Sequence, residues 1–363
     1  AIAYHIAQAL KLRDALRIEF NEITRDAVRT ALASPRSIDT ERVEAQEARR
    51  ILDRLVGYKL SPLLQRRVRG QSAGRVQSVV LRIICDRERE ILAFVPEEYW
   101  SVTATLSPRA PEKPFPFEAK LVAIDGKGKR HELASDSQEQ KTEEQAAKGD
   151  WLLRTQGEAE SVVQELQGAV YRVASVKKRQ QRRNPQAPFT TSTMQQEASR
   201  KLGFSNKRTM QTAQALYEGI ELGEEGSVGL ITYMRSDSVR VAAEAQTEAR
   251  GYIAQAYGEP YLPKTPPRYK TKGASQDAHE AIRPTSVGRT PDSVAQFLKP
   301  DQAKLYRLIW QRFVASQMTA ALFDITTADI AAGRFTFRAT GSVQKFDGFM
   351  RVYTEGKDGA ETT

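Results

Sequence analysis

The stretch "GLITYMRSDS", Gly229 to Ser238, places a tyrosine two residues before an arginine, after a β-prone run. A tyrosine with a pKa near ~10 is a weak nucleophile at neutral pH and needs a nearby cation or base to attack a phosphorus atom. Arg235 suits Tyr233 as a partner, because a guanidinium can neutralise charge on a phosphoryl group through two aligned N–H donors. These two residues alone leave open a core tyrosine beside a surface arginine.

A second group of polar residues lies in "QDAHEAIRPT", which supplies His279 and Arg283. A helical His-Glu pair is typical of zinc proteases, but their motif needs a second histidine four positions on, where Arg283 stands. We therefore expect no zinc, and predict a polar cluster of His279 and Arg283 that is able to bind phosphate. A structural histidine is the alternative. The phosphate loop Gly-x-x-x-x-Gly-Lys-Ser/Thr occurs nowhere in the sequence, so no ATPase module is predicted.

A third group lies in "RVEAQEARRILDRLVGY". At about 100° per residue, one helical face carries polar and charged side chains. That face contains Arg42, Gln46, Arg49, Arg50 and Asp53. Its arginines could track a nucleic-acid backbone, and Tyr58 could stack on a base. A carboxylate facing nucleic acid is costly unless it accepts a hydrogen bond from a base amino group such as cytosine N4. Asp53 either does so or forms a surface pair with Arg49, Arg50 or Arg54.

The elements that position these residues follow from periodicity. Residues 1–97 are predicted to be mostly helical. The apolar stripe of one helix is expected at Ala48, Ile51, Leu52, Leu55 and Val56, and the buried stripe of the next at Val76, Val79, Val80, Ile83 and Ile84. Between them, the small-residue loop "RGQSAG" holds Ser72 close to the start of the second helix, where backbone N–H groups can meet a phosphate.

Strand alternation begins near Glu97 and returns in "AVYRVASVKKRQQRR". A domain boundary is predicted at "RRNPQAP", and a helical pattern runs from Phe189 to about Met318, with "GLITY" as a short strand. Alternation then resumes in "LFDITTADIAAGRFTFRATG". If this second β segment rejoins the first, the helical domain is an insertion between two halves of a β domain.

Composition bounds the function classes. The 363 residues carry 55 Lys and Arg against 45 Asp and Glu, a net charge of +10 that favours an anionic partner such as nucleic acid. No uninterrupted apolar stretch approaches the ~18–20 residues of a membrane span. With one cysteine, Cys85, a disulfide framework is excluded. We therefore expect a cytoplasmic protein.

Taken together and in order, these stretches resemble the type IA DNA topoisomerases, and the bacterial topoisomerase I branch most closely. The matching stretches are "FNEIT", "AQEARRILDRLVGY", "SPLL", "SAGRVQSVVLRIICDREREILAFVPEEYW", "APFTTSTMQQEASRKLGF", "LITYMRSDS" and "QDAHEAIRPT". They span residue 1 to about Gly348, which is nearly the whole chain.

The resemblance implies that Tyr233 attacks a phosphodiester of single-stranded DNA and forms a 5′-phosphotyrosine link. The other strand then passes through the break, and resealing relaxes negative supercoils without ATP. Arg235 would stabilise the scissile phosphate, and His279 would hydrogen-bond near it. Gln214, Glu218 and Asp237 are implied as active-site neighbours. The implied DNA-binding residues of the single-strand groove are Arg42, Arg49, Arg50, Asp53, Arg54, Tyr58, Ser72, Arg75 and Gln77.

The implied fold is multidomain α/β, with a helical groove domain, a β-rich arch domain and an inserted helical domain that carries the active-site tyrosine, toroidal in the family. The expected bounds are 1–40 for the tail of a Toprim-like domain, 41–97 for the single-strand DNA groove, 98–186 for the first part of the arch, 187–318 for the helical domain with Tyr233, and 319–363 for the second part of the arch.

One departure from the family is large. Its Toprim domain precedes the region that reads "AIAYHIAQAL" here and binds Mg²⁺ through an Asp-x-Asp-x-Glu cluster that this sequence lacks. We therefore interpret the chain as a topoisomerase fragment without a metal site. The expected partner is a single-stranded segment of negatively supercoiled DNA, bound by a monomer at the nucleoid, away from membranes. A single-stranded DNA-binding fragment without turnover is the alternative. A third possibility, a reverse gyrase, would need a helicase ATP-binding motif, which this sequence lacks.

Overall fold

The computed structural model describes residues 2–109, 115–128, 153–269 and 280–356. By their contacts these residues form two compact units. The first consists of residues 1–20 and 25–96, and the second of residues 21–24 and 97–363. Each unit is described by itself.

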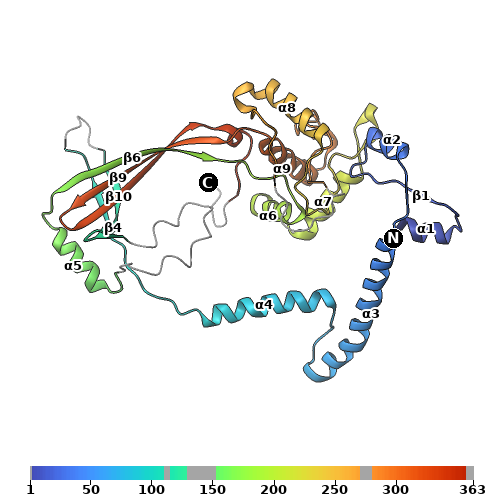
Figure 1. Cartoon of the computed structure of the whole chain (residues 1–363), viewed down its shortest axis with the longest axis horizontal. Coiled ribbons are helices and arrows are strands. Elements are labelled where there is room, and N and C mark those ends of the chain that lie inside the picture. The colour runs from blue at the N-terminus through green and yellow to red at the C-terminus, as the bar shows by residue number, and fades with distance from the viewer. Residues whose placement is uncertain (1, 110–114, 129–152, 270–279, 357–363) are drawn as a thin grey trace. The chain divides into compact units, whose positions relative to one another are not determined.

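The first unit is mainly helical (Figure 1). Its elements are α1 (Ile2–Ala9), β1 (Leu16–Arg17), α2 (Arg25–Ala33), β2 (Arg36–Ser37), α3 (Thr40–Val68) and α4 (Arg75–Ala93). Helix α3 begins where the Asp39 carboxylate accepts a hydrogen bond from the Arg42 amide at 3.0 Å, and ends at Arg69 in the left-handed conformation. The two helices and the loop between them are thus confirmed as predicted.

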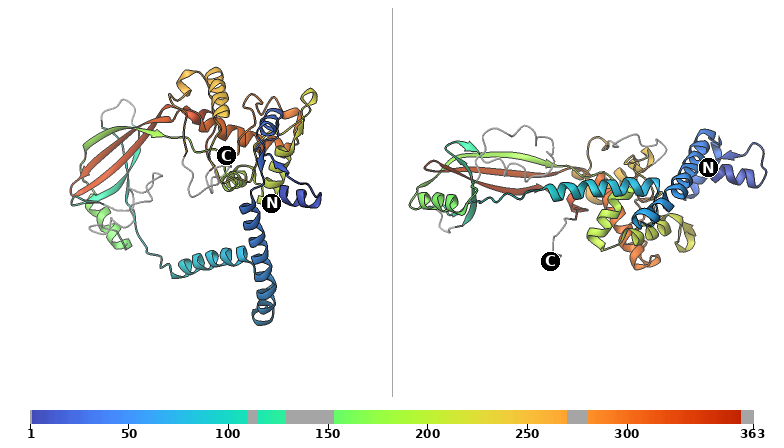
Figure 2. Two further views of the ribbon diagram at one scale, coloured as in Figure 1. Left: turned by 45° about the vertical axis from the view of Figure 1, so that its right-hand side comes forward. Right: turned by 90° about the horizontal axis from the view of Figure 1, so that it is seen from below.

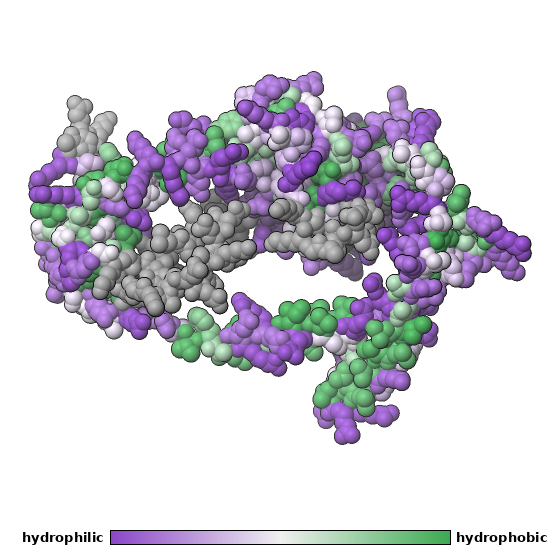
Figure 3. All heavy atoms as spheres, viewed as in Figure 1, coloured by the Kyte–Doolittle hydropathy of each residue, from purple (hydrophilic) through white to green (hydrophobic). Residues whose placement is uncertain are grey.

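The burial predicted for the apolar stripe of α4 is wrong, and most of the apolar stripe of α3 is exposed as well. On α3, Ile51 is 59% exposed and Leu52 and Leu55 are exposed as well; the whole predicted stripe of α4, Val76, Val79, Val80, Ile83 and Ile84, is exposed. Figure 3 shows this hydrophobic surface along both helices. Periodicity reports that a helix has an apolar face, but it carries no information on what covers that face.

The second unit contains a long antiparallel sheet in the order β3-β4-β10-β9-β6, with β5 paired to β4. Its strands are β3 (Thr103–Leu106), β4 (Phe117–Ile124), β5 (Lys127–Gly128), β6 (Tyr171–Arg183), β9 (Ala321–Ala332) and β10 (Phe335–Phe346). Helix α5 (Gln156–Leu166) begins at a Thr155–Glu158 capping box and packs its apolar face on one end of the sheet (Figure 2). This mixed α/β content agrees with the predicted class.

A helical segment connects β6 to β9. It contains the helices α6 (Thr191–Leu202), α7 (Asn206–Glu218), α8 (Ala243–Tyr257) and α9 (Pro300–Ser316) and the short strands β7 (Ile220–Glu221) and β8 (Ser227–Val228). Its 3₁₀ turns are η2 (Gly223–Glu225), η3 (Glu259–Tyr261) and η4 (Ala295–Phe297). A further 3₁₀ turn, η5 (Gly348–Arg351), follows β10. Strands β6 and β9 pair from Tyr171–Ala332 to Arg183–Ala321, although this segment separates them in the chain. Buried side chains from all four helices form one core around Phe189, Met194 and Phe313.

The strand predicted at "GLITY" is wrong. Residues 229–233 form no named strand, and only Ile231 makes a single antiparallel bridge, to Pro284. The backbone partners of this stretch come from several separate segments rather than from one neighbouring strand. Hydrophobic and β-branched residues predict an extended backbone, but a ladder also needs a continuous partner.

Candidate active site and nucleic-acid interface

Residues 229–242 form the loop between β8 and α8, and its middle part is extended. Thr232, Met234, Ser236 and Ser238 are buried, whereas the intervening Tyr233, Arg235 and Asp237 are exposed. An extended backbone sends alternate side chains to opposite sides. The structure therefore brings Tyr233, Arg235 and Asp237 to one exposed face of the loop, where the Tyr233 side chain is 38% exposed.

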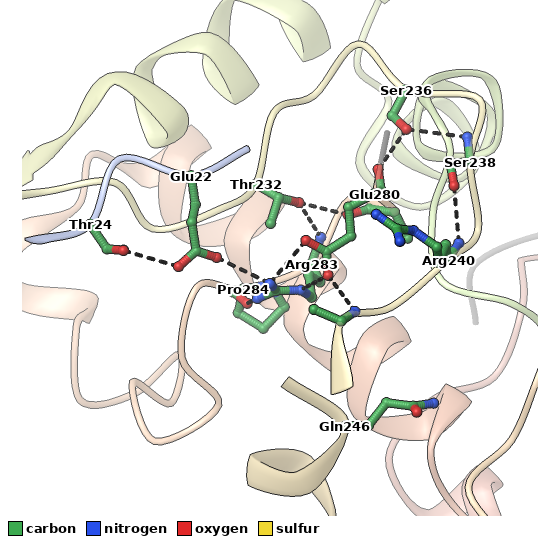
Figure 4. A network of polar contacts seen from close by, with 12 residues as sticks. Glu22, Thr24, Thr232, Ser236, Ser238, Arg240, Gln246, Glu280, Arg283 and Pro284 are labelled. Carbon is green, nitrogen blue, oxygen red and sulfur yellow. Dashed lines mark hydrogen bonds and ion pairs between the residues drawn. The ribbon is translucent and has the colours of Figure 1, made fainter. Parts of the chain in front are cut away.

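The buried face of the loop is anchored through hydroxyl groups (Figure 4). The Thr232 hydroxyl donates to the Ala281 carbonyl at 2.7 Å and accepts from the Arg283 amide at 3.0 Å. The Ser236 hydroxyl donates to the Glu280 carbonyl at 2.5 Å. Because each of these buried groups has a partner in the segment 280–284, the exposed face is held in one register.

Helix α6 holds the same loop from its N-terminal end. The Thr191 amide donates to the Ser236 carbonyl at 2.8 Å, and the Ser236 amide donates to the Thr191 hydroxyl at 2.9 Å. The Thr191 hydroxyl also donates to the Met234 carbonyl at 2.9 Å. Three contacts to one threonine fix the backbone on both sides of Arg235.

Arg283 does not form the phosphate-binding cluster that the sequence suggested. Its side chain is buried and bound to two carboxylates, with Nε 2.7 Å from Glu280 Oε1 and Nη2 3.1 Å from both Glu280 Oε2 and Glu22 Oε2. Burial alone would lower the pKa of Arg283, but the charges and hydrogen bonds of Glu280 and Glu22 outweigh burial and raise it. Arg283 is therefore a structural cation. His279 lies outside the described residues.

The short segment 21–24 contacts the loop of residues 229–242, called the tyrosine loop from here on, through its backbone. The Tyr233 amide donates to the Asn21 carbonyl at 2.8 Å, and the Gly229 amide donates to the Ile23 carbonyl at 3.1 Å. A Cβ atom added at Gly229 would lie 3.1 Å from that Ile23 oxygen and 2.7 Å from the Tyr217 oxygen. Only glycine permits this close approach.

Helix α7 supplies an aromatic neighbour of Tyr233. The Tyr217 ring meets the Tyr233 ring edge to face, with 5.3 Å between centroids. Burial raises the pKa of the Tyr217 hydroxyl, and the charge of Tyr233 adds to the rise. Gln214 Nε2 donates to Glu218 Oε1 at 2.5 Å, so these two predicted neighbours are paired with each other on α7.

The predicted DNA-binding residues lie in the first unit. A cavity of about 690 Å³ there is lined by Gln46, Arg49, Arg50, Asp53, Arg54, Gly57, Tyr58, Ser61, Ser72 and Ala73. The structure thus brings six of the nine predicted groove residues to one cavity wall. The other three, Arg42, Arg75 and Gln77, are outside the lining, although Arg75 and Gln77 bond to residues within it.

Asp53 has a partner that the sequence did not suggest. Its Oδ1 accepts from Arg75 Nε at 2.9 Å, and both side chains remain well exposed. Ser72 Oγ lies 3.4 Å from Gln77 Oε1, and the Arg54 guanidinium lies 5.9 Å from the centroid of the Tyr58 ring. Arg42 pairs with Asp39 at 3.1 Å at the start of α3. Arg75, at the start of helix α4, therefore fixes one oxygen of Asp53 from outside the cavity lining.

Gln46 is a residue whose importance the sequence did not indicate. Its Oε1 atom is buried and has no hydrogen-bond partner among the residues that the structure describes, although Gln46 lines the cavity. A buried amide oxygen without a partner is unusual in a folded protein. The helical spacing placed Gln46 on the arginine face, but nothing in the sequence distinguished it from a solvated glutamine.

The described residues do not fit a magnesium ion, because among them no three His, Cys, Asp or Glu side chains gather where a cation could be held. Nor is any helix in the described ranges long and apolar enough to cross a membrane.

Comparison with known proteins adds two findings. A family model described as DNA topoisomerase matches residues 37–363. The solved structure of full-length topoisomerase I from Thermotoga maritima is 38% identical in sequence and superposes with a TM-score of 0.75, over 99% of this chain and 54% of that one. The chain therefore spans about half the length of this relative.

Proposed function

Because the chain belongs to the type IA DNA topoisomerases, we propose that it binds single-stranded DNA and supplies the nucleophile with which such an enzyme relaxes negatively supercoiled DNA. The observation that carries the proposal is the shared exposed face of Tyr233 and Arg235, on a loop whose other face is anchored by Thr232 and Ser236. A nucleophile needs access to its substrate together with a fixed position, and this loop provides both.

In the proposed reaction, the Tyr233 hydroxyl attacks the phosphorus of a phosphodiester. A bond forms between the tyrosine oxygen and phosphorus, the bond from phosphorus to the 3′ oxygen breaks, and the proton lost by tyrosine is taken up by that 3′ oxygen. Arg235 stabilises the negative charge on the phosphoryl oxygens. One phosphoester replaces another, so the 3′ hydroxyl can reseal the break without ATP after strand passage.

Residues Gln214, Glu218, Asp237 and His279 are proposed to border the scissile phosphate. The family's magnesium has no matching donor set among the described residues, and no step is assigned to it. The arrangement of a groove domain at 41–97, an arch from 98–186 and 319–363, and an inserted tyrosine domain at 187–318 belongs to the same proposal. The protein is proposed to act as a monomer on the nucleoid of the cytoplasm.

The groove in the first unit is proposed to hold the single strand upstream of the cut. Its arginines neutralise phosphates, and the Tyr58 ring stacks on a base. Asp53 Oδ1 is bonded to Arg75, which leaves Oδ2 to accept from a base amino group such as cytosine N4. This role explains why a carboxylate stands among arginines in the cavity wall.

A second candidate function is single-stranded DNA binding without turnover. The cavity is lined only by residues of the first unit, so it does not depend on Tyr233. Incubation of the 363-residue chain with negatively supercoiled plasmid and Mg²⁺ separates the two. Relaxation of the plasmid supports the enzyme; binding of an oligonucleotide by the chain, with no relaxation even after a family Toprim domain is joined to its N-terminus, supports the binding module.

A further inference from the structure

Glu22 is the only side chain of the segment 21–24 that forms an ion pair among those the structure describes, and it does so with Arg283 at 3.1 Å. Its second oxygen, Oε1, accepts from the Thr24 hydroxyl at 3.0 Å. The side chain of Glu22 is 19% exposed, and that of Arg283 is 6% exposed. Glu22 is therefore held largely away from water with both oxygens hydrogen-bonded (Figure 4).

The backbone on either side of Glu22 contacts the loop of the nucleophile. The carbonyl of Asn21, one residue before, accepts from the Tyr233 amide, and the carbonyl of Ile23, one residue after, accepts from the Gly229 amide. The Glu22 side chain thus anchors the same three-residue stretch whose carbonyls hold Tyr233. Loss of that anchor is expected to weaken the two backbone bonds together, because all three contacts share one short segment.

Arg283 keeps a full partner when Glu22 is removed. Glu280 binds it through two oxygens, and Glu280 also accepts from the Ala242 amide at 2.7 Å. The opposite change, loss of Arg283, would leave two carboxylates in a buried site without a cation, which destabilises the fold as a whole. Glu22 is therefore the member of the cluster whose loss affects the tyrosine loop and leaves the core intact.

We propose that Glu22 is a positioning residue for Tyr233: its ion pair with Arg283 fixes the segment 21–24, whose carbonyls set the backbone of the nucleophile. The inference deepens the proposed function and rests on it for the role of Tyr233. Glu22 itself does not touch the reacting atoms. It acts through the Asn21 carbonyl, 2.8 Å from the Tyr233 nitrogen.

Amide hydrogen exchange in the 363-residue chain tests this positioning without any need for activity. In Glu22→Ala, exchange at the Tyr233 and Gly229 amides rises about tenfold or more, since a charged hydrogen bond that holds their acceptors is lost. Exchange at Leu230 and Ile282 stays at the wild-type rate, because their acceptors are Leu216 and Phe189. Glu22→Gln, which keeps one of the two acceptor oxygens and loses the negative charge, gives an intermediate rise.

A matched control disrupts a different ion pair between a glutamate and an arginine of the same unit. Glu225 pairs with Arg289 at 2.9 Å on the surface, so Glu225→Gln leaves the Tyr233 and Gly229 amides unchanged. Two results overturn the inference: unchanged exchange at Tyr233 in Glu22→Ala, or an equal rise at Tyr233, Leu230 and Ile282, which would show a general loss of stability.

Kinetics provide a second measurement, in the chain extended at its N-terminus by a family Toprim domain. At saturating oligonucleotide, Glu22→Ala lowers the rate of covalent adduct formation about tenfold or more, while the Kd for the oligonucleotide stays at the wild-type value. An unchanged rate, or a loss confined to Kd, contradicts positioning. If the wild-type protein forms no adduct, the proposed function fails, and the exchange experiment still decides the role of Glu22 in the loop.

Discussion

The ring of Tyr217 packs edge to face against the ring of Tyr233, with 5.3 Å between their centroids. Tyr217 lies one residue before Glu218 at the end of α7, and the neighbouring Leu216 carbonyl accepts from the Leu230 amide in the tyrosine loop. The helix therefore restrains the position of Tyr233, the proposed nucleophile, both through a ring contact and through a backbone bond to its loop.

Replacement of Tyr217 by leucine removes the ring contact and leaves Tyr233 with more rotamers. An aromatic pair contributes ~0.5–1.5 kcal/mol, so adduct formation in the Toprim-extended protein slows by up to about tenfold. Tyr217→Phe keeps the ring and stays within about twofold of wild type. A rate in Tyr217→Leu equal to that of wild type would show that the ring contact does not orient Tyr233.

Gly229 is predicted to accept no side chain. In Gly229→Ala the new methyl group clashes with the Tyr217 and Ile23 carbonyl oxygens, which costs about 1–3 kcal/mol and lowers the thermal midpoint. Gly251 in α8 serves as the control, because a Cβ atom there meets nothing within 4 Å. Gly251→Ala raises the midpoint as a helix-interior change should. Equal midpoints for Gly229→Ala and wild type would contradict the close approach.

The elements of this fold were largely predictable, since helix caps and apolar periodicity are local signals. Helices α3 and α4 stand where the sequence indicated, and α6 to α9 lie within the helical pattern predicted from Phe189 to about Met318. Thr190 and Ser205 cap α6 and α7. The anchoring of the tyrosine loop was not predictable. The backbone partners of Tyr233 and Thr232 are Asn21 and Arg283, distant in sequence, so no local pattern carries that information.

The candidate site was predicted only in part, because residue types and helical spacing are local signals whereas contacts between distant segments are not. Side-chain chemistry and helical spacing proposed Tyr233, Arg235 and the arginine face as site residues, and their roles stay predictions; the structure shows that Tyr233 and Arg235 share an exposed face. Arg283 was predicted to bind phosphate, but in the structure it is buried and paired with Glu22 and Glu280. The sequence does not show that these two carboxylates lie beside it. Asp53 likewise paired with Arg75 from the next helix instead of an arginine on its own helix.

Gln46 is predicted to bind nucleic acid through its unpartnered amide oxygen. Gln46→Leu weakens binding of a single-stranded oligonucleotide about tenfold, while thermal stability is unchanged or slightly higher, because a buried polar atom without a partner is removed. Titration and thermal unfolding of the same sample measure both effects. Gln65 on the same helix donates to the Gln71 carbonyl at 2.9 Å, so Gln65→Leu loses stability and keeps affinity. The reverse pattern would contradict this role.

Alkaline pH is predicted to destabilise the second unit. Burial raises the pKa of the Tyr306 and Tyr269 hydroxyls well above the ordinary value of 10.0. As pH rises through about 10, the unfolded chain releases these protons while the folded chain retains them, so the free energy of unfolding falls. Thermal midpoints between pH 8 and 11 measure the slope. Tyr306→Phe, which also loses a 2.7 Å hydrogen bond to the Arg289 carbonyl, flattens it; an unaltered slope would contradict the assignment.

The role of Tyr233 as nucleophile is tested most directly by the covalent adduct. The Toprim-extended protein is incubated with a 5′-labelled and a 3′-labelled single-stranded oligonucleotide, quenched with detergent, and digested for peptide mapping. Wild type is expected to retain the 3′ label on a peptide that contains Tyr233, and Tyr233→Phe to retain neither label while it binds the oligonucleotide with the wild-type Kd. An adduct in Tyr233→Phe, or an adduct mapped to another residue, would contradict the account.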